Sequence, residues 1–157
     1  EGGLRVPFLA AWPGTIPEGQ SFDHPVSALD IFATAAAAAG IPLPADRVYD
    51  GVNLLPHLTG RAEGPPHEAL YWQMGFAKAI RQGDWKLLLN DYQQDTILYH
   101  IATDPYERRD VHQQHPEVVE QLRAAHAAWA DQMAEPLWPG MIYFEFRDAA
   151  GRYVFED

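Results

Sequence analysis

The stretch ALYWQMGFAKAIRQGDWKLLLNDYQQDTILYHI, residues 69–101, decides the fold of this chain. Short runs rich in aromatic and aliphatic residues follow one another there, separated by turn-forming residues at Gly75, at Gln82-Gly83-Asp84 and at 90–95. The pattern predicts four short strands, at 69–74, 76–81, 85–89 and 96–101. Strands spaced so closely pair antiparallel, because parallel pairing requires a long crossover connection. The stretch therefore predicts a four-stranded antiparallel meander.

A strong helical pattern follows the meander, from Pro116 to about Ala134. Proline suits the first position of a helix, and Glu117 and Glu120 favour the positive end of the helix dipole. Apolar side chains recur at the spacing of one helix face, namely Val118, Val119, Leu122, Ala125, Trp129 and Met133. We expect this stripe to cover one face of the meander. Beyond it, residues 141–146 and 153–155 predict a terminal hairpin.

The N-terminal part of the chain has a different pattern. Residues 4–12 are mostly apolar and predict a buried strand that ends at Pro13-Gly14. Arg5 within it would need a carboxylate partner, and Glu1 is the nearest one. Residues 27–39 predict a helix with Ser27 as its N-cap. The buried face of this helix is expected to hold Val26, Leu29, Phe32, Ala33 and Ala36.

A proline-rich loop separates the two patterns and ends near Gly64, where we place a subdomain boundary. The predicted domains are residues 1–64 and 65–157. The predicted class is α+β: a small four-stranded antiparallel sheet packed by a C-terminal helix. A strand and a helix that belong to a larger domain precede this sheet.

Composition excludes several classes of function. The 157 residues carry 22 acidic and 11 basic side chains, a formal net charge of -11 that repels nucleic-acid phosphates. The chain has no cysteine, which excludes disulfides, zinc–thiolate sites and cysteine nucleophiles. No apolar run approaches the roughly 20 residues of a membrane span, and no signal peptide is visible at the start. We expect a soluble chain that binds neither nucleic acid nor membrane, and its start at Glu1-Gly2-Gly3 indicates a fragment.

Basic side chains of the meander are the main candidates for chemistry. Lys78, Arg81 and Lys86 are either solvated strand positions or an anion-binding edge, because guanidinium matches sulfate or carboxylate geometry. In a regular strand, Lys78 and Arg81 fall on opposite faces. Three aromatic residues of the meander are either core residues or a platform for a sugar, namely Trp72, Trp85 and Tyr99.

Other candidates are weaker. Neither Ser21 nor Ser27 lies in a Gly-x-Ser-x-Gly motif. His112 and His115 have a spacing that could seat a metal, but His115 is more simply the start of the helix that follows.

Five segments form an ordered series of motifs. They are Glu1–Phe8 with Trp12-Pro13-Gly14 (E-G-G-x-R-V-P…W-P-G), 26–34 (V-S-x-x-D-x-x-P-T, with Ala33 for proline), 50–56 (D-G-x-S-L-x-P), 79–87 (R-x-G-D-W-K-L) and 98–110 (L-Y-x-L-x-x-D-P-x-E). In this order they resemble the C-terminal end of the sulfatase family, within the alkaline phosphatase superfamily. The resemblance covers residues 1 to about 133.

The resemblance implies that residues 1–64 end a large α/β catalytic domain and that 65–157 form its small antiparallel subdomain. Family members hydrolyse sulfate esters with a formylglycine, made from Cys or Ser in a C/S-x-P/A-x-R motif, and with calcium held by Asp and Asn. This chain has no such motif. The resemblance therefore gives it no catalytic residue and no metal ligand, and the isolated chain is expected to be inactive. The parent protein is expected to use calcium and formylglycine.

In the family this subdomain helps to shape the substrate cleft. On that basis we expect substrate contacts from Trp72, Lys78 and Arg81, and structural roles for Glu1 and Arg5. The expected partners are the remainder of the catalytic domain and a sulfate-ester substrate.

Two alternatives stay open at this point. The parent could be a phosphonate monoester or phosphodiester hydrolase, because those relatives share the C-terminal pattern. The chain could instead be a non-catalytic binding module that self-associates, since a strand at 4–12 without sheet neighbours leaves an open apolar edge.

Overall fold

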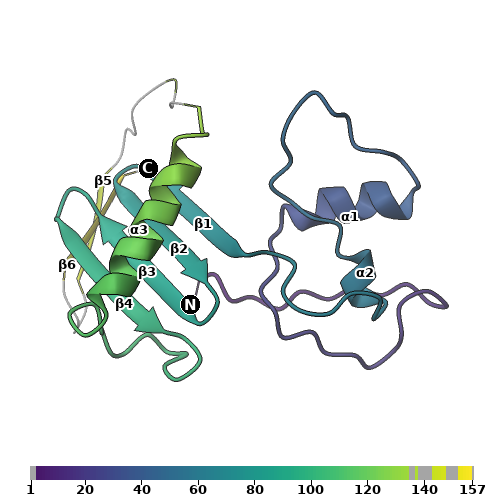
Figure 1. The fold of residues 1–157 in the computed structure, drawn as a ribbon, viewed down its shortest axis with the longest axis horizontal. Helices are drawn as coiled ribbons and strands as arrows, with labels where there is room; N and C mark the ends of the chain where they lie inside the picture. The colour runs from purple at the N-terminus through teal and green to yellow at the C-terminus, as the bar shows by residue number, and fades with distance from the viewer. Residues whose placement is uncertain (1–2, 135–136, 138–142, 148–151, 157) are drawn as a thin grey trace. The chain divides into compact units, whose positions relative to one another are not determined.

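Figure 1 shows the computed structural model of the chain, which describes residues 3–134, 137, 143–147 and 152–156. The chain divides into two compact units. The smaller unit holds residues 6–68, and the larger unit holds 69–157 together with the first five residues.

The larger unit is built on an antiparallel meander. Its strands follow the order β1-β2-β3-β4, and every neighbouring pair is antiparallel. The predicted meander is confirmed, with each strand end within one residue of its predicted place. The strands are β1 (Ala69–Met74), β2 (Ala77–Gln82), β3 (Trp85–Asn90) and β4 (Asp95–His100).

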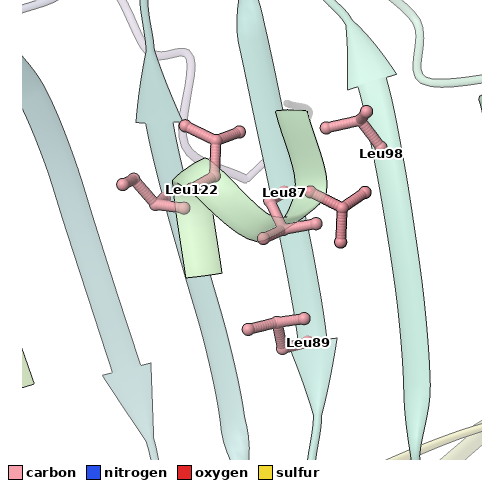
Figure 2. Close-up of a cluster of buried hydrophobic side chains, with 6 residues drawn as sticks. Leu87, Leu89, Leu98 and Leu122 are labelled. Carbon is pink, nitrogen blue, oxygen red and sulfur yellow. The ribbon is translucent and has the colours of Figure 1, made fainter. Parts of the chain in front are cut away.

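One helix, α3 (Pro116–Ala130), lies across one face of this sheet (Figure 1). The core forms where its stripe meets the strands: Ile80, Leu87 and Leu98 are fully buried against Leu122 and Val119. Figure 2 shows the labelled leucines of β3, β4 and α3 converging in this cluster. Burying such side chains stabilises a fold by roughly 1.5–3 kcal/mol each, so this contact holds the unit together.

The predicted end of this helix is wrong by four residues. The helix ends at Ala130, and Met133, predicted to be the last member of the stripe, is exposed. No basic residue lies in its last turn to favour the negative end of the helix dipole. The predicted terminal hairpin is confirmed as β5 (Tyr143–Arg147) paired antiparallel with β6 (Arg152–Glu156).

The smaller unit contains α1 (Asp30–Ala38) and the short α2 (Leu55–Leu58). The observed helix α1 begins three residues later than predicted. Residues 27–31 form tight turns instead, in which Asp30 N–H donates to the Ser27 carbonyl (3.1 Å). Ser27 is therefore not the N-cap, which is Leu29. Its hydroxyl nevertheless accepts the Leu29 N–H at 3.3 Å. Among the described residues, no helix has the length and apolarity needed to cross a bilayer.

Three predictions for the smaller unit and its N-terminal edge are wrong. Residues 4–12 form no strand and are exposed, because a strand requires a hydrogen-bonded neighbour and no described segment provides one. Arg5 is likewise exposed, so it needs no buried partner; Glu1, its predicted partner, lies outside the described residues. On α1, the predicted buried residues Leu29 and Phe32 are exposed, whereas Ala33 and Asp30 are buried.

Gly51 allows a loop to pass close to the start of α1. A Cβ on Gly51 would lie 2.1 Å from the carbonyl oxygen of Leu29. We expect Gly51→Ala to lower the free energy of unfolding of the smaller unit by about 1–3 kcal/mol, because the backbone must shift to accept a methyl group. Urea unfolding of the smaller unit checks this. Gly3→Ala is the control, because Gly3 belongs to the larger unit and a Cβ there meets nothing within 4 Å. Equal midpoints for the two variants would show that the close approach is absent.

Candidate functional site

A tight turn after β4 fixes the position of Glu107. Asp104 accepts the backbone N–H groups of Arg108 and Arg109 through one oxygen, both at 2.8 Å. This turn holds Glu107 in the left-handed region, with φ 54°, a conformation that costs a non-glycine residue about 1–3 kcal/mol. The D-P-x-E motif therefore acts as a positioning device for the Glu107 side chain.

Glu107 meets Lys86 of β3 in a buried ion pair. Lys86 Nζ lies 2.6 Å from Glu107 Oε1, and the lysine side chain is 3% exposed. An ammonium group taken out of water requires such a partner, because the desolvation cost is several kcal/mol. The R-x-G-D-W-K-L and D-P-x-E motifs thus meet through this pair.

The sheet has two faces with different chemistry. In the register of β2 and β3, Ile80 pairs with Leu87, and both lie in the core that contacts α3. The next pair, Arg81 and Lys86, therefore lies on the opposite face, which does not contact α3. Trp72, paired with Ala79, lies on the same face. Because Arg81 pairs with Leu70, its side chain is a diagonal neighbour of Trp72.

The structure therefore brings two of the three predicted substrate-contact residues together. Trp72 and Arg81 are both half-buried and share a face with the Lys86–Glu107 pair. Such a face offers an aromatic surface beside a planar cation, a combination that suits a ligand with an anionic group. That these residues contact substrate stays a prediction.

Lys78 lies apart from them. It is on the α3 face of β2, as the strand alternation predicts, and its Nζ lies 2.5 Å from Asp91 Oδ2. Trp72, Lys78 and Arg81 thus do not gather on a single surface of the sheet.

Two other aromatic residues of the meander belong to the packed interior. Trp85 packs against the core cluster, with its ring 4.6 Å from that of His100 and 4.9 Å from that of His115. Tyr99 is buried. The core alternative is confirmed for both, and neither provides a sugar platform.

A buried carboxylate in the smaller unit is the feature that sequence reasoning missed. Asp30 is fully buried, and its two oxygens accept the N–H of Ser27 (2.7 Å) and the N–H of Val52 (2.8 Å). His67 Nε2 lies within 3.0 Å of both oxygens. Asp30 thus links three segments, and the most distant of them, at His67, lies 37 positions away from Asp30 in sequence.

Thr34 repeats this arrangement one helical turn later. Its hydroxyl accepts the N–H of Leu54 at 2.9 Å. Asp30 and Thr34 share one face of α1, because residues four apart are neighbours on a helix. The aspartate and threonine of the V-S-x-x-D-x-x-x-T segment therefore bind the backbone of the D-G-x-x-L loop. In the sequence, only its position after Pro65-Pro66 distinguishes His67, the third partner of Asp30.

A calcium site requires several oxygen ligands that converge on one point. No three His, Asp or Glu side chains converge on one point in the part of the chain that the structure describes. His112 pairs with Asp110 (Nδ1 to Oδ2, 2.7 Å), and His115 faces Glu117 at 3.6 Å, so the two histidines have separate partners.

Two carboxylates of the larger unit have lowered pKa values. Burial raises the pKa of Glu107, but the charges it faces, Lys86 foremost, lower it, and the resulting pKa lies below the ordinary 4.5. Burial also raises the pKa of Asp110, but hydrogen bonds from the Leu98 N–H and from His112 bring it below 3.8. A carboxyl group with a lowered pKa stabilises the fold above its unfolded-state pKa, and this stabilisation is lost as pH falls through the folded-state value.

We therefore expect the free energy of unfolding of the larger unit to fall as pH drops below about 4.5, the ordinary pKa of Glu107. Urea unfolding at a series of pH values checks this. The double variant Glu107→Gln, Asp110→Asn should show a flatter pH dependence over the same range. An equally steep curve would assign the acid sensitivity to other groups.

Comparison with known proteins agrees with the motifs. The sequence model of the family described as N-sulphoglucosamine sulphohydrolase, C-terminal, matches residues 1–132. Human steryl-sulfatase is 49% identical over 71 residues, which are 45% of this chain and 12% of that protein. Human N-acetylgalactosamine-6-sulfatase is 33% identical over 137 residues, which cover 69% of this chain and 26% of that protein.

Solved structures share the fold. The crystal structure of Ps i-CgsB matches with a TM-score of 0.68 and 30% identity, over 81% of this chain and 29% of that chain. The chain thus spans 12% to 29% of the length of these relatives. The match of the family over most of the chain, with the antiparallel sheet and its covering helix, leads to one conclusion. This chain belongs to the N-sulphoglucosamine sulphohydrolase C-terminal family and is similar to the C-terminal portion of sulfatases.

Proposed function

We propose that the protein containing this chain hydrolyses sulfate esters. The family match over residues 1–132 is the observation that carries this proposal. Its relatives include steryl-sulfatase and N-acetylgalactosamine-6-sulfatase, which supports the reaction class without naming the substrate.

In this proposal the nucleophile and the metal ligands come from residues outside this chain. The chain has no cysteine, and neither Ser21 nor Ser27 lies in a C/S-x-P/A-x-R motif. A formylglycine would supply the attack on sulfur, and calcium would be held by residues other than those described, because these provide no ligand cluster.

The larger unit would contribute a wall of the substrate cleft. Trp72 and Arg81 support this role because they lie side by side on the face that does not contact α3. Lys86 on β3 lies directly opposite Arg81 on β2. The Lys86–Glu107 ion pair would therefore stabilise the arrangement of side chains on this face.

The smaller unit would be covered by the remainder of the catalytic domain. Several large apolar side chains support this, because they stand exposed on a unit that has few buried apolar residues of its own. They include Leu9, Leu29, Ile31, Phe32 and Val48.

The test is an activity assay on the whole protein and on residues 1–157 alone. We expect the whole protein to hydrolyse 4-nitrophenyl sulfate in preference to a 4-nitrophenyl phosphonate monoester and to bis(4-nitrophenyl) phosphate. The isolated chain should hydrolyse none of them. Preference for either phosphorus ester would replace the sulfatase proposal by the phosphonate or phosphodiester alternative. Turnover by the isolated chain would overturn the assignment of the nucleophile to residues outside it.

A further inference from the structure

One aspartate of the smaller unit is followed by glycine, at Asp50-Gly51. No other glycine in the sequence follows an aspartate or an asparagine. The side-chain carboxyl carbon of an aspartate and the backbone nitrogen of the next residue can close a five-membered ring. A side chain on the following residue obstructs this closure, and glycine has none. Asp50 is therefore the aspartate of this chain that is best placed by its sequence context to cyclise.

The loop that leads to this pair is not held by hydrogen bonds. Within residues 42–51, all of which the structure describes, no backbone N–H or C=O group takes part in a hydrogen bond. Asp50 is exposed, and its carboxylate has neither a hydrogen-bonding nor an ion-pair partner among the described residues. The Asp50 side chain can therefore turn toward the next backbone nitrogen without breaking a polar contact.

The fold itself requires the glycine that makes Asp50 reactive. The Gly51 N–H donates to no acceptor in the described part of the chain, so its nitrogen is not engaged. A Cβ on Gly51 would lie 2.1 Å from the carbonyl oxygen of Leu29 and 2.4 Å from its carbonyl carbon. The close approach of this loop to the start of α1 thus excludes any side chain that would slow ring closure.

We propose that Asp50 is a site of spontaneous isomerisation to isoaspartate. The Gly51 nitrogen attacks Asp50 Cγ: the N–Cγ bond forms, and the amide proton leaves with the side-chain hydroxyl as one water molecule. Water then adds to one of the two carbonyl groups of this cyclic imide and breaks its bond to nitrogen. Opening at Cγ restores aspartate, whereas opening at the former backbone carbonyl leaves the chain linked through Cγ. One water leaves and one returns, so the mass is unchanged and no other reactant is consumed.

Isoaspartate at this position disturbs the link made by Asp30. Linkage through Cγ lengthens the backbone by one methylene group just before Gly51, which has no room to shift toward Leu29. The next residue, Val52, is anchored twice: its N–H donates to Asp30 Oδ1 at 2.8 Å, and its carbonyl accepts the Thr34 hydroxyl at 3.4 Å. The inserted carbon atom therefore weakens the contact of Val52 with the buried carboxylate. This consequence does not depend on the hydrolysis of sulfate esters by the parent protein.

The test is incubation of the whole protein at neutral pH and physiological temperature, followed by peptide mapping. Isoaspartate is identified by methylation with an L-isoaspartyl methyltransferase and by resistance to an endoproteinase that cleaves before aspartate. It should accumulate about tenfold faster at Asp50 than at Asp23, an exposed aspartate of the same unit that is followed by histidine, because glycine leaves the nitrogen unobstructed. Equal amounts of isoaspartate at the two positions would overturn the proposal.

A peptide that spans residues 45–55 gives the rate without the fold. Isomerisation at Asp50 of the whole protein should be within about tenfold of the peptide rate, because no hydrogen bond has to open first. A whole protein that reacts more than about a hundredfold more slowly than the peptide would show that the loop is held or covered. The proposal would then be wrong.

Two variants at the same position vary the chemistry alone. Asp50→Glu should abolish the modification, because its ring would have six members and closes far more slowly. Asp50→Asn should accelerate it, since asparagine forms the same imide with loss of ammonia. A rate at Asp50 that is the same in all three proteins would contradict the imide route.

Hydrogen exchange reports the structural consequence. In isomerised protein, the amides of Val52 and Leu54, which bind Asp30 and Thr34, should exchange about tenfold faster than in fresh protein. Asp50→Glu incubated in the same way should keep the exchange rates it had before incubation. Unchanged exchange at both amides in the isomerised protein would contradict the effect on the Asp30 link.

Discussion

Replacement of Asp30 by asparagine should lower the free energy of unfolding of the smaller unit by about 3 kcal/mol, because a buried backbone N–H loses its acceptor. Both carboxylate oxygens accept hydrogen bonds, from Ser27 N–H on one side and Val52 N–H on the other. In either orientation, an amide at this position would turn its NH2 group toward one of these two backbone N–H groups. Two donors would then face each other in a site that is 0% exposed.

Hydrogen exchange measures this effect where it arises. In Asp30→Asn, amides of α1 and of residues 51–58 should exchange faster, because the carboxylate is the link between these segments. Asp23→Asn makes the same chemical change on an exposed carboxylate of the same unit, whose Ser21 contact is 3.4 Å long. This control should change the stability by less than about 0.5 kcal/mol. Similar exchange in the two variants would show that Asp30 is not the link.

Replacement of Lys86 by methionine should destabilise the larger unit by a similar amount, about 3–5 kcal/mol. Methionine fills much of the lysine volume, so the loss reports the charge rather than a cavity. Glu107 would be left as a carboxylate without Lys86, the cation that lies 2.6 Å away in the native protein.

A double-mutant cycle separates the pair from its surroundings. The variant with both Lys86→Met and Glu107→Gln should be more stable than Lys86→Met alone, because the carboxylate that lost its lysine is then replaced by a neutral amide. Lys78→Met is the matched control, since Lys78 forms an ion pair with Asp91 at a half-exposed site. That change should cost only about 0–1 kcal/mol. Equal losses for Lys78→Met and Lys86→Met, measured by urea unfolding, would contradict the role of burial.

The meander could be predicted from sequence because its determinants are local. The turn residues, such as Gly83 with φ 57°, fix where each strand reverses, and antiparallel neighbours are adjacent in the chain. The apolar stripe of α3 has the same local character, which is why the sheet and its covering helix follow from residues 69–130 alone. The family resemblance, carried by short motifs in order, was also available without coordinates.

The N-terminal segment shows where local reasoning fails. Residues 4–12 have the composition of a buried strand, yet they form none, because strand formation depends on a neighbour whose presence composition does not record. For the same reason the apolar residues of α1 do not reveal which face is covered. Leu29 and Phe32 are exposed, and the polar Asp30 takes the buried position.

Sequence by itself determined the class of this protein: an antiparallel meander with a covering helix, and motifs of the sulfatase C-terminal region in their family order. Tertiary structure decided what those motifs do. Only folding brings His67 to Asp30, Glu107 to Lys86 and Arg123 to Thr96. Turns and helices are specified by residues within a few positions of one another, whereas a charged side chain finds its partner through contacts between distant segments.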